Sequence, residues 1–270
     1  MTAPVTRIDA IRYARHERTA GANFAAPVDD HDVPMPLDYF VWAIHGAAGE
    51  PPVIVDTGFG ESAAVARGRT ITRPVIEGLR DAGIDHLSVE DVILTHLHYD
   101  HAGSLGTFPN ARFHVQDAEL AFATGREVLN RAVRAPFDGE PVAQLVRKLY
   151  TDHVVFHAGD AEFAPGIGLR FLPGHTAGLQ AVACETARGT VVLASDAAHL
   201  YANLVRRNAF PIFIDQAAYA AAQARLLALA DHSLDRIIPG HDPLVLVAFP
   251  GENDIARVDL VPLTPIAELV

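Results

Sequence analysis

The segment DVILTHLHYDH at residues 91–101 constrains the fold more than any other part of this sequence. Its apolar start, DVIL, is typical of a short buried strand, and a cluster of three histidines and one aspartate follows it. Burying so many imidazoles and a carboxylate without partners would be costly. Neutral imidazole nitrogens and carboxylate oxygens bind zinc and other divalent cations, which would remove that cost. The segment therefore predicts a strand that ends at a metal site.

The spacing inside this cluster predicts that one short loop serves two metal ions. Neighbouring side chains of an extended segment point to opposite sides, so His96 and His98 share one side. A turn at Tyr99 can then direct Asp100 and His101 toward a second point. Each of the two points would still need further ligands from elsewhere in the chain.

Three candidate donors follow other strand-like runs. His175 lies in LPGHTAG, Asp196 ends VVLASD, and His241 lies in IIPGHD. A carboxylate such as that of Asp196 can bridge two cations. The expected cofactors are two divalent metal ions, with zinc as the default, although nitrogen and oxygen ligands also accept iron, manganese or cobalt. With a bridging hydroxide, such a site would carry a residual charge of about +1 and would polarise a carbonyl group.

Alternating strand and helix signals along the rest of the chain indicate an α/β protein. Strands are expected at residues 36–44, 51–58, 91–96, 111–115, 154–159, 168–175, 179–186, 190–196 and 236–241. Helices are expected at residues 73–83, 116–123 and 215–231. We expect one domain over residues 1–270, with a long loop at 14–36 and a helical insertion at 124–150 flanking the site. Within that insertion, the helical spacing of Val142, Leu145, Val146 and Leu149 favours core packing over a pocket wall.

Composition and charge narrow the classes of function. A net charge of −12 fits poorly with a nucleic-acid partner, and no run approaches the roughly 18 apolar residues of a membrane span. The single cysteine, Cys184, cannot form an internal disulfide, and no apolar signal-peptide core precedes the first strand, so we expect a cytoplasmic protein. Cys184 itself is interpreted as a small buried hydrophobe. The apolar tail VDLVPLTPIAELV either covers the core or contacts a second copy in a homodimer.

Four motifs in fixed order resemble the metallo-β-lactamase superfamily: THLHYDH, PGHTAG, the strand-end SDA, and PGHD, over roughly residues 37–242. The resemblance implies a four-layer αββα sandwich with two metals at one edge, between the sheets. It implies that His96, His98 and His175 bind one metal, that Asp100, His101 and His241 bind the other, and that Asp196 bridges them. It also implies that Asp56, in the DTG at 56–58, steadies the metal loop. No cysteine stands at a strand end, which excludes the branch that uses a cysteine ligand.

Within this superfamily the chain is most similar to the N-acyl-homoserine lactonases and the related 4-pyridoxolactonases, through SDAAHLYANL and FPIFID. The resemblance implies a quorum-quenching hydrolase that opens a small-molecule lactone by attack of a metal-bridging hydroxide, with Asp100 and Asp196 as catalytic residues. Those lactonases often carry a tyrosine three residues after the bridging aspartate. Here His199 stands at that position and Tyr201 follows, so both are candidates for contact with the substrate.

Other interpretations remain open from the sequence alone. An acyl chain could meet Phe24, Met35, Phe40, Phe137 or Phe210, although ordinary packing is the simpler reading for each. A thioester hydrolase of the glyoxalase II type would use the same ligands, with Arg206 and Arg207 as candidates for an anionic substrate. A 4-pyridoxolactonase or another small-lactone hydrolase is a further alternative. A metal-bound binding or scaffold protein without turnover is the alternative from a different class.

Overall fold

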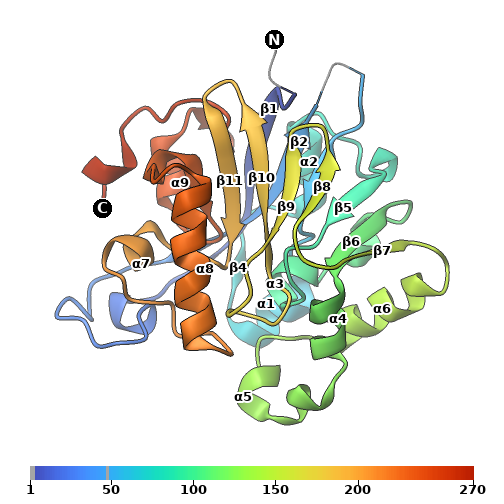
Figure 1. Cartoon of the computed structure of the whole chain (residues 1–270), viewed down its shortest axis with the longest axis horizontal. Helices are drawn as coiled ribbons and strands as arrows, with labels where there is room; N and C mark the ends of the chain where they lie inside the picture. Colours follow the sequence, from blue (N-terminus) through green and yellow to red (C-terminus); the bar gives the residue numbers. More distant parts are fainter. Residues whose placement is uncertain (1–3, 47–48) are drawn as a thin grey trace.

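The computed structural model describes residues 4–46 and 49–270, so the first three residues of the domain predicted over 1–270 lie outside it. Two β-sheets pack against each other, and helices cover their outer faces (Figure 1). Both sheets mix parallel and antiparallel neighbours. The fold is therefore α/β, as the alternation of strand and helix signals predicts.

The larger sheet has β1 and β2 near its centre, and β4 (Thr70–Ile71) pairs with β1 outside the main order. In spatial order its other strands are β13 (Gly251–Glu252), β14 (Ile255–Arg257), β1 (Arg7–His16), β2 (Leu37–His45), β3 (Val53–Val55), β5 (Asp91–Ile93), β6 (Arg112–Gln116) and β7 (Val154–His157). The smaller sheet runs in the order β12 (Ile237–Pro239), β11 (Gly189–Ser195), β10 (Gln180–Thr186), β9 (Ile167–Phe171) and β8 (Ala161–Ala164). The parallel pairs are β3–β5, β5–β6, β6–β7 and β11–β12.

Short helices connect the strands of the larger sheet, and one longer helix covers the smaller sheet. The helices are α1 (Glu61–Arg67), α2 (Val75–Asp81), α3 (Tyr99–Ala102), α4 (Asp117–Ala123), α5 (Arg131–Arg134), α6 (Gly139–Leu149), α7 (Tyr201–Val205), α8 (Gln216–Leu229) and α9 (Leu244–Ala248). α8 begins where the Asp215 side chain accepts a hydrogen bond from the Ala218 amide at 2.9 Å, a typical N-terminal cap. Figure 1 shows α8 running alongside β11, the strand of the smaller sheet that it contacts.

The core consists of three apolar layers, which together define four layers of secondary structure. Along β2, Val41 and Ala43 face α1 and α2, whereas Phe40, Trp42 and Ile44 face the smaller sheet. This alternation follows from the two-residue period of a strand. A third layer lies between the smaller sheet and α8. The arrangement confirms the predicted αββα sandwich.

Cys184 and α6 lie where the sequence places them. The Cys184 thiol is fully buried between the two sheets, where burial raises its pKa. On α6, Val142 and Leu145 are buried and Val146 packs against them, so the helical stripe belongs to the core.

The N-terminal segment differs from its prediction. The loop predicted over residues 14–36 begins later, because β1 continues to His16 and pairs with β2 along its whole length. Charged side chains interrupt the apolar pattern of β1 and hide the strand in the sequence. The structure compensates those charges locally: Arg12 pairs with Asp38 at 3.1 Å, and Arg7 pairs with the buried Asp9 at 2.7 Å.

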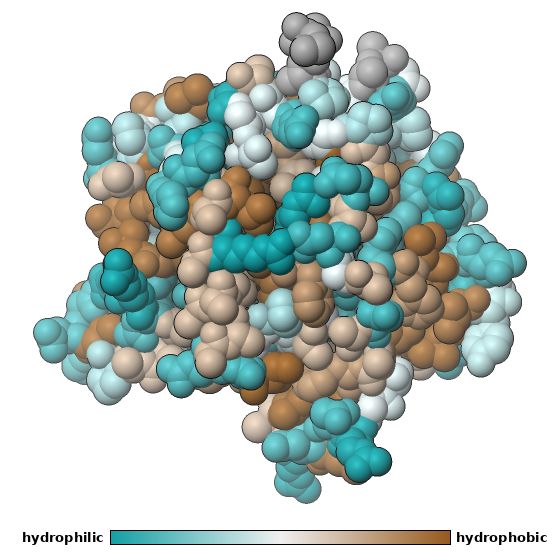
Figure 2. Space-filling view, viewed as in Figure 1, coloured by the Kyte–Doolittle hydropathy of each residue, from teal (hydrophilic) through white to brown (hydrophobic). Residues whose placement is uncertain are grey.

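The molecular surface mixes hydrophilic and hydrophobic residues on the face shown in Figure 2, with brown groups gathered near α6 and near α9. In the C-terminal tail, Val261 and Leu263 remain exposed. Ile266 is buried and belongs to the apolar layer between the two sheets. Part of the tail therefore covers the core, and a homodimer through its exposed part stays a prediction. Among the described residues, no helix is both long and apolar enough to cross a membrane.

Candidate metal centre

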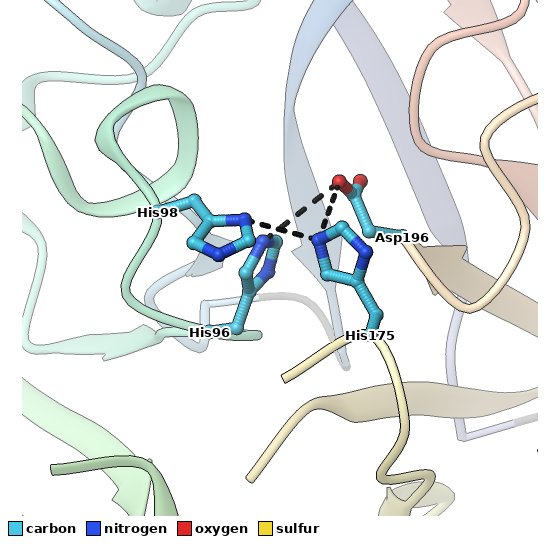
Figure 3. A group of neighbouring side chains, drawn as sticks. All are labelled: His96, His98, His175 and Asp196. Carbon is cyan, nitrogen blue, oxygen red and sulfur yellow. Dashed lines mark hydrogen bonds and ion pairs between the residues drawn. The ribbon is translucent and has the colours of Figure 1, made fainter. Parts of the chain in front are cut away.

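The seven predicted donors come together at one edge of the sandwich, at loops that follow strands of both sheets. His96 and His98 lie in the loop after β5, and Asp100 and His101 lie on α3. From the smaller sheet, His175 follows β9, Asp196 follows β11, and His241 follows β12. Figure 3 shows four of them, with His96 and His98 on one side and His175 and Asp196 on the other.

One group of donors consists of His96, His98, His175 and Asp196, whose candidate ligand atoms all lie within 4.8 Å of one another. His175 Nε2 is 3.0 Å from His98 Nδ1 and 3.2 Å from Asp196 Oδ2. His96 Nε2 is 3.8 Å from the same oxygen. All four side chains are buried, so any ion held here would be shielded from bulk solvent.

A second group consists of Asp100, His101 and His241. His241 Nε2 lies 3.8 Å from Asp100 Oδ2, and His101 Nε2 lies 3.9 Å from it. These two imidazoles also face the other oxygen of Asp196: Oδ1 is 3.0 Å from His241 Nε2 and 3.2 Å from His101 Nε2. The Asp196 carboxylate therefore stands between the two groups and offers one oxygen to each.

Hydrogen bonds from the outer ring nitrogens to backbone carbonyls fix the orientation of two imidazoles. Nδ1 of His175 is 2.8 Å from the Ile212 carbonyl oxygen, and Nδ1 of His241 is 3.0 Å from the Asp38 carbonyl oxygen. Because a carbonyl only accepts, each Nδ1 must carry the proton, and Nε2 of the neutral ring points inward as a lone pair. Donation of the outer nitrogen to a carbonyl or carboxylate is the usual arrangement around a metal-binding histidine.

Unpaired polar atoms at the centre fit a cation. Nε2 of His96, Nε2 of His101 and Oδ1 of Asp196 are all buried without a hydrogen-bond partner among the described residues. His101 Nδ1 lies 2.7 Å from Asp56 Oδ2, and donation to this carboxylate leaves Nε2 as an acceptor that faces another acceptor. A cation between these atoms would satisfy them, so the residues present fit metal ions.

The pKa shifts of the histidines also fit a bound cation. Burial, reinforced by the neighbouring imidazoles, lowers the pKa of His96 and of His98, which keeps them in the neutral form that binds metals. Burial would lower the pKa of His101 too, but the carboxylates of Asp196 and Asp56 outweigh it and raise that pKa. The concentrated negative charge thus attracts a proton to His101, and a metal ion would compete for the same place.

Asp56 lies where the resemblance places it. Its carboxylate accepts hydrogen bonds from the Thr95 amide at 2.7 Å and from the Thr95 hydroxyl at 2.8 Å, and it contacts His101. Asp56 holds a positive φ of 64°, an uncommon conformation for a residue with a side chain. The residue therefore links β3 to both halves of the loop that carries His96 and His101.

Glu119, on α4, is a supporting residue that the sequence did not reveal. Its fully buried carboxylate accepts hydrogen bonds from the Leu97 amide at 2.9 Å and from the Gly178 amide at 2.8 Å. Leu97 lies between two candidate ligands of the larger sheet, and Gly178 closes the loop that carries His175. One carboxylate thus connects the metal-binding loops of the two sheets. No motif or spacing in the sequence marks it.

Two glycines allow the close approach of backbone segments around the donors. Gly174, before His175, has φ of 132°, and a Cβ there would collide with the backbone of Tyr219. A Cβ on Gly240, before His241, would stand 2.7 Å from Asp196 Oδ1. The glycine in each PGH sequence is therefore required by the space around the next histidine.

The two candidate substrate contacts have different environments. His199 is buried at the centre: its Nε2 lies 2.9 Å from Asp196 Oδ2, and its ring stacks on Phe210 at 3.7 Å. Burial lowers the pKa of His199 to about 3. The hydroxyl of Tyr201 instead donates to the Ile237 carbonyl at 2.7 Å, fully buried between the sheets. We therefore do not retain Tyr201 as a substrate contact.

A cavity of about 340 Å³ opens beside the donors, with His98 and His175 in its wall. Its apolar side is formed by the segments around α5 and after α7, which include Val133, Ile212 and Ile214. Segment 124–150 thus contributes to the cavity through its part around α5, while α6 packs into the core.

None of the five residues proposed for an acyl groove lines this cavity. Phe137 packs against the His98 ring, with ring centroids 4.7 Å apart, and Phe210 packs against His199. Phe40 belongs to the core between the sheets, Phe24 lies under the Arg206 guanidinium, and Met35 lines a separate depression.

The arginines considered for an anionic thioester also lie elsewhere. Arg206 forms two hydrogen bonds with the carboxylate of Asp30, both at 2.9 Å. Arg206 and Arg207 line a different depression, next to α8. Neither residue lines the cavity that contains His98 and His175.

Comparison with known proteins gives one family and a consistent set of relatives. A family model described as the metallo-beta-lactamase superfamily matches residues 35–241. An N-acyl homoserine lactonase from Bacillus thuringiensis is 28% identical over 233 residues, which cover 81% of this chain and 84% of the relative.

Solved structures agree with this comparison. A quorum-quenching N-acyl homoserine lactone lactonase superposes with a TM-score of 0.73 at 26% identity, over 90% of this chain and 95% of the other. An N-acyl homoserine lactone hydrolase, solved with the product N-hexanoyl-L-homoserine bound at its catalytic metal center, gives a TM-score of 0.72 at 25% identity, again over 90% of this chain and 95% of the other.

Proposed function

We propose that this chain, which belongs to the metallo-β-lactamase superfamily, is a metal-dependent hydrolase that opens lactone rings. The observation that carries the proposal is the position of Asp196, whose two oxygens face two separate groups of inward-pointing imidazole nitrogens. The relatives supply the substrate class, because similar proteins are named N-acyl homoserine lactonases. N-acyl-homoserine lactones are therefore the first substrates to test, and quorum quenching is the corresponding role.

The proposed ligand set follows the two groups of donors. His96, His98 and His175 hold one cation, Asp100, His101 and His241 hold the other, and Asp196 contributes one oxygen to each. Zinc is the first metal to test, and iron, manganese and cobalt accept the same nitrogen and oxygen donors. Divalent cations, once bound, supply a hydroxide nucleophile at neutral pH and polarise an ester carbonyl.

The residues of the chain have distinct tasks in this scheme. Asp100 is the most exposed of the seven donors, with 12% of its side chain accessible. Its carboxylate could accept the proton of the attacking oxygen and pass it to the leaving alkoxide of the opened ring. His199 donates from Nε2 to Asp196 Oδ2 and so holds the shared carboxylate in position. The cavity beside His98 and His175 receives the part of the substrate outside the lactone ring.

The experiment must distinguish this function from three alternatives. A 4-pyridoxolactonase or another small-lactone hydrolase would use the same residues on a different ring. A glyoxalase II-like enzyme would cleave a thioester, but Arg206 and Arg207 lie outside the cavity, which removes their support for this option. A metal-bound scaffold would hold cations without turnover.

The test combines metal analysis with a panel of substrates. Purified protein is analysed for metal content, and acid release is followed with N-acyl-homoserine lactones of several chain lengths, 4-pyridoxolactone and a glutathione thioester. Asp100→Asn serves as the control that should lose turnover and keep its fold. Turnover of lactones but not of the thioester supports the proposal. Turnover of the thioester alone refutes it in favour of a glyoxalase II-like enzyme, and bound metal without any turnover refutes it in favour of a scaffold.

A further inference from the structure

Two arginines form one wall of the cavity that contains His98 and His175. Arg67, at the end of α1, and Arg69, just after it, both line this cavity and are half-buried. No acidic side chain lines the same cavity within residues 4–46 and 49–270. In a chain with a net charge of −12, this concentration of positive charge beside the reacting centre calls for an explanation.

Neutral groups hold both guanidinium groups in place. Arg67 donates to the Ala135 carbonyl at 2.9 Å and to the Phe137 carbonyl at 3.1 Å, and its Cζ lies 3.9 Å from the centre of the Tyr99 ring. Arg69 donates from Nε to the Tyr99 hydroxyl at 3.1 Å. Within the part of the chain that the structure describes, neither guanidinium forms an ion pair with a carboxylate. The two side chains are therefore fixed, but their charges are not neutralised.

The effect of this charge reaches a neighbouring histidine. Arg69 Nη1 lies 3.1 Å from His16 Nε2. Burial, followed by the charges of Arg69 and Arg18, lowers the pKa of His16 to about 4. His16 is thus neutral at pH 7, so the positive charge beside the cavity comes from the arginines and not from this imidazole.

We propose that Arg67 and Arg69 bind an anionic group on the substrate, remote from the lactone ring, so that the preferred substrate is a lactone with a carboxylate-like substituent. The inference rests on the proposed lactonase function and deepens it. Guanidinium groups bind carboxylates through charge-assisted hydrogen bonds, and a fixed, unneutralised guanidinium loses little entropy when it does so. Apolar residues that line the same cavity, such as Val133 and Ile212, would contact the chain that joins the anion to the ring.

The test uses matched pairs of substrates that differ only at the far end of the acyl chain. N-hexanoyl- and N-adipoyl-homoserine lactone have equal chain length, and only the second ends in a carboxylate. Butanoyl with succinyl, and octanoyl with suberoyl, give shorter and longer pairs. Opening the ring produces the same new carboxylate in both members of a pair. The ratio of their kcat/KM values therefore reports only the remote anion.

At the best chain length we expect kcat/KM to be about tenfold higher for the anionic member, since the guanidinium groups are only half-buried. Raising the ionic strength from about 0.05 to 0.5 M should reduce this ratio, because salt screens partly exposed charges. Arg69→Gln should bring the ratio to within about twofold of one, whereas Arg69→Lys should keep part of it through the retained charge. Arg80→Gln, which removes an exposed arginine on α2 outside the cavity, should keep the full preference.

A binding measurement separates this inference from the proposed function. Lactam analogues, in which an N–H replaces the ring oxygen of the hexanoyl and adipoyl compounds, are titrated into the protein by calorimetry. If no lactone is opened but the adipoyl lactam binds more tightly through Arg69, the proposed function fails and the anion site stands. If neutral lactones are opened at least as well as anionic ones at every chain length, the anion site is refuted and the lactonase stands. A preference that survives in Arg69→Gln also refutes the assignment.

Discussion

Replacing Glu119 with alanine would remove the carboxylate that joins the metal-binding loops of the two sheets. The amides of Leu97 and Gly178, which donate to it at 2.9 and 2.8 Å, would lose their partner. An unpaired buried donor costs about 1–3 kcal/mol, so two of them cost about 2–6 kcal/mol. For a chain of this size, about 4 kcal/mol corresponds to a fall in Tm of about 10 °C.

The same change should weaken metal binding, although Glu119 is not a candidate ligand. Leu97 and Gly178 hold the backbone next to His96, His98 and His175, so their release makes the positions of these imidazoles less defined. Loss of a residue that orients ligands typically reduces metal affinity by about 10–100-fold. Glu119→Gln keeps one accepting oxygen and should show a smaller effect on both quantities.

Thermal unfolding and competition with a chromophoric chelator measure the two effects separately. Glu77→Ala, an exposed glutamate on α2, is the matched control and should change neither. A lower Tm with unchanged metal affinity would refute the idea that Glu119 positions the ligands, because its role would then be structural only. An unchanged Tm would refute the expected cost of leaving the amides of Leu97 and Gly178 without a partner.

Three further predictions follow from the same contacts. Removing metal with a chelator should lower Tm, and adding zinc at about 1,000 times its Kd should restore about 4 kcal/mol; equal Tm values in both states would contradict the proposed ligand set. Asp56→Ala leaves the Thr95 amide and the outer nitrogen of His101 unpaired, so calorimetric unfolding and metal analysis should show lower stability, by roughly 3–5 kcal/mol, and substoichiometric metal. Because the pKa of His16 is about 4 in the folded chain and about 6.5 in an unfolded one, only the unfolded chain gains a proton as pH falls through this window. Wild-type protein should therefore lose more stability to urea between pH 7 and pH 5 than His16→Gln, and an equal loss would show that His16 is not responsible.

The donor set was accessible from the sequence because each donor follows an apolar strand at a turn. Motif spacing placed His96 to His101 in one loop, and the PGH sequences located His175 and His241 at strand ends. The family match confirms the resemblance that these motifs carry, and the three apolar layers confirm the predicted sandwich.

The parts that the sequence did not reveal depend on contacts between distant segments. β1 was missed because its charges are compensated by Asp38 and other residues elsewhere in the chain, which no local pattern records. Glu119 resembles any helical glutamate until the fold brings Gly178 to it. The sequence could not decide whether Tyr201 contacts substrate or packs in the core. Its hydroxyl donates to the carbonyl of Ile237 in β12, a contact between segments that are distant in the sequence.

The donors of this centre come from both sheets, between residues 96 and 241, and this has a mechanical consequence for the chain. Cations held there would act as reversible cross-links that close long loops, a task that disulfides perform in many other proteins. With a single cysteine sealed between the sheets, this chain has no disulfide of its own to do so. Metal binding would therefore restrict the separation of the two sheets. Without metal, the interface between the two sheets should be the first part of the protein to unfold.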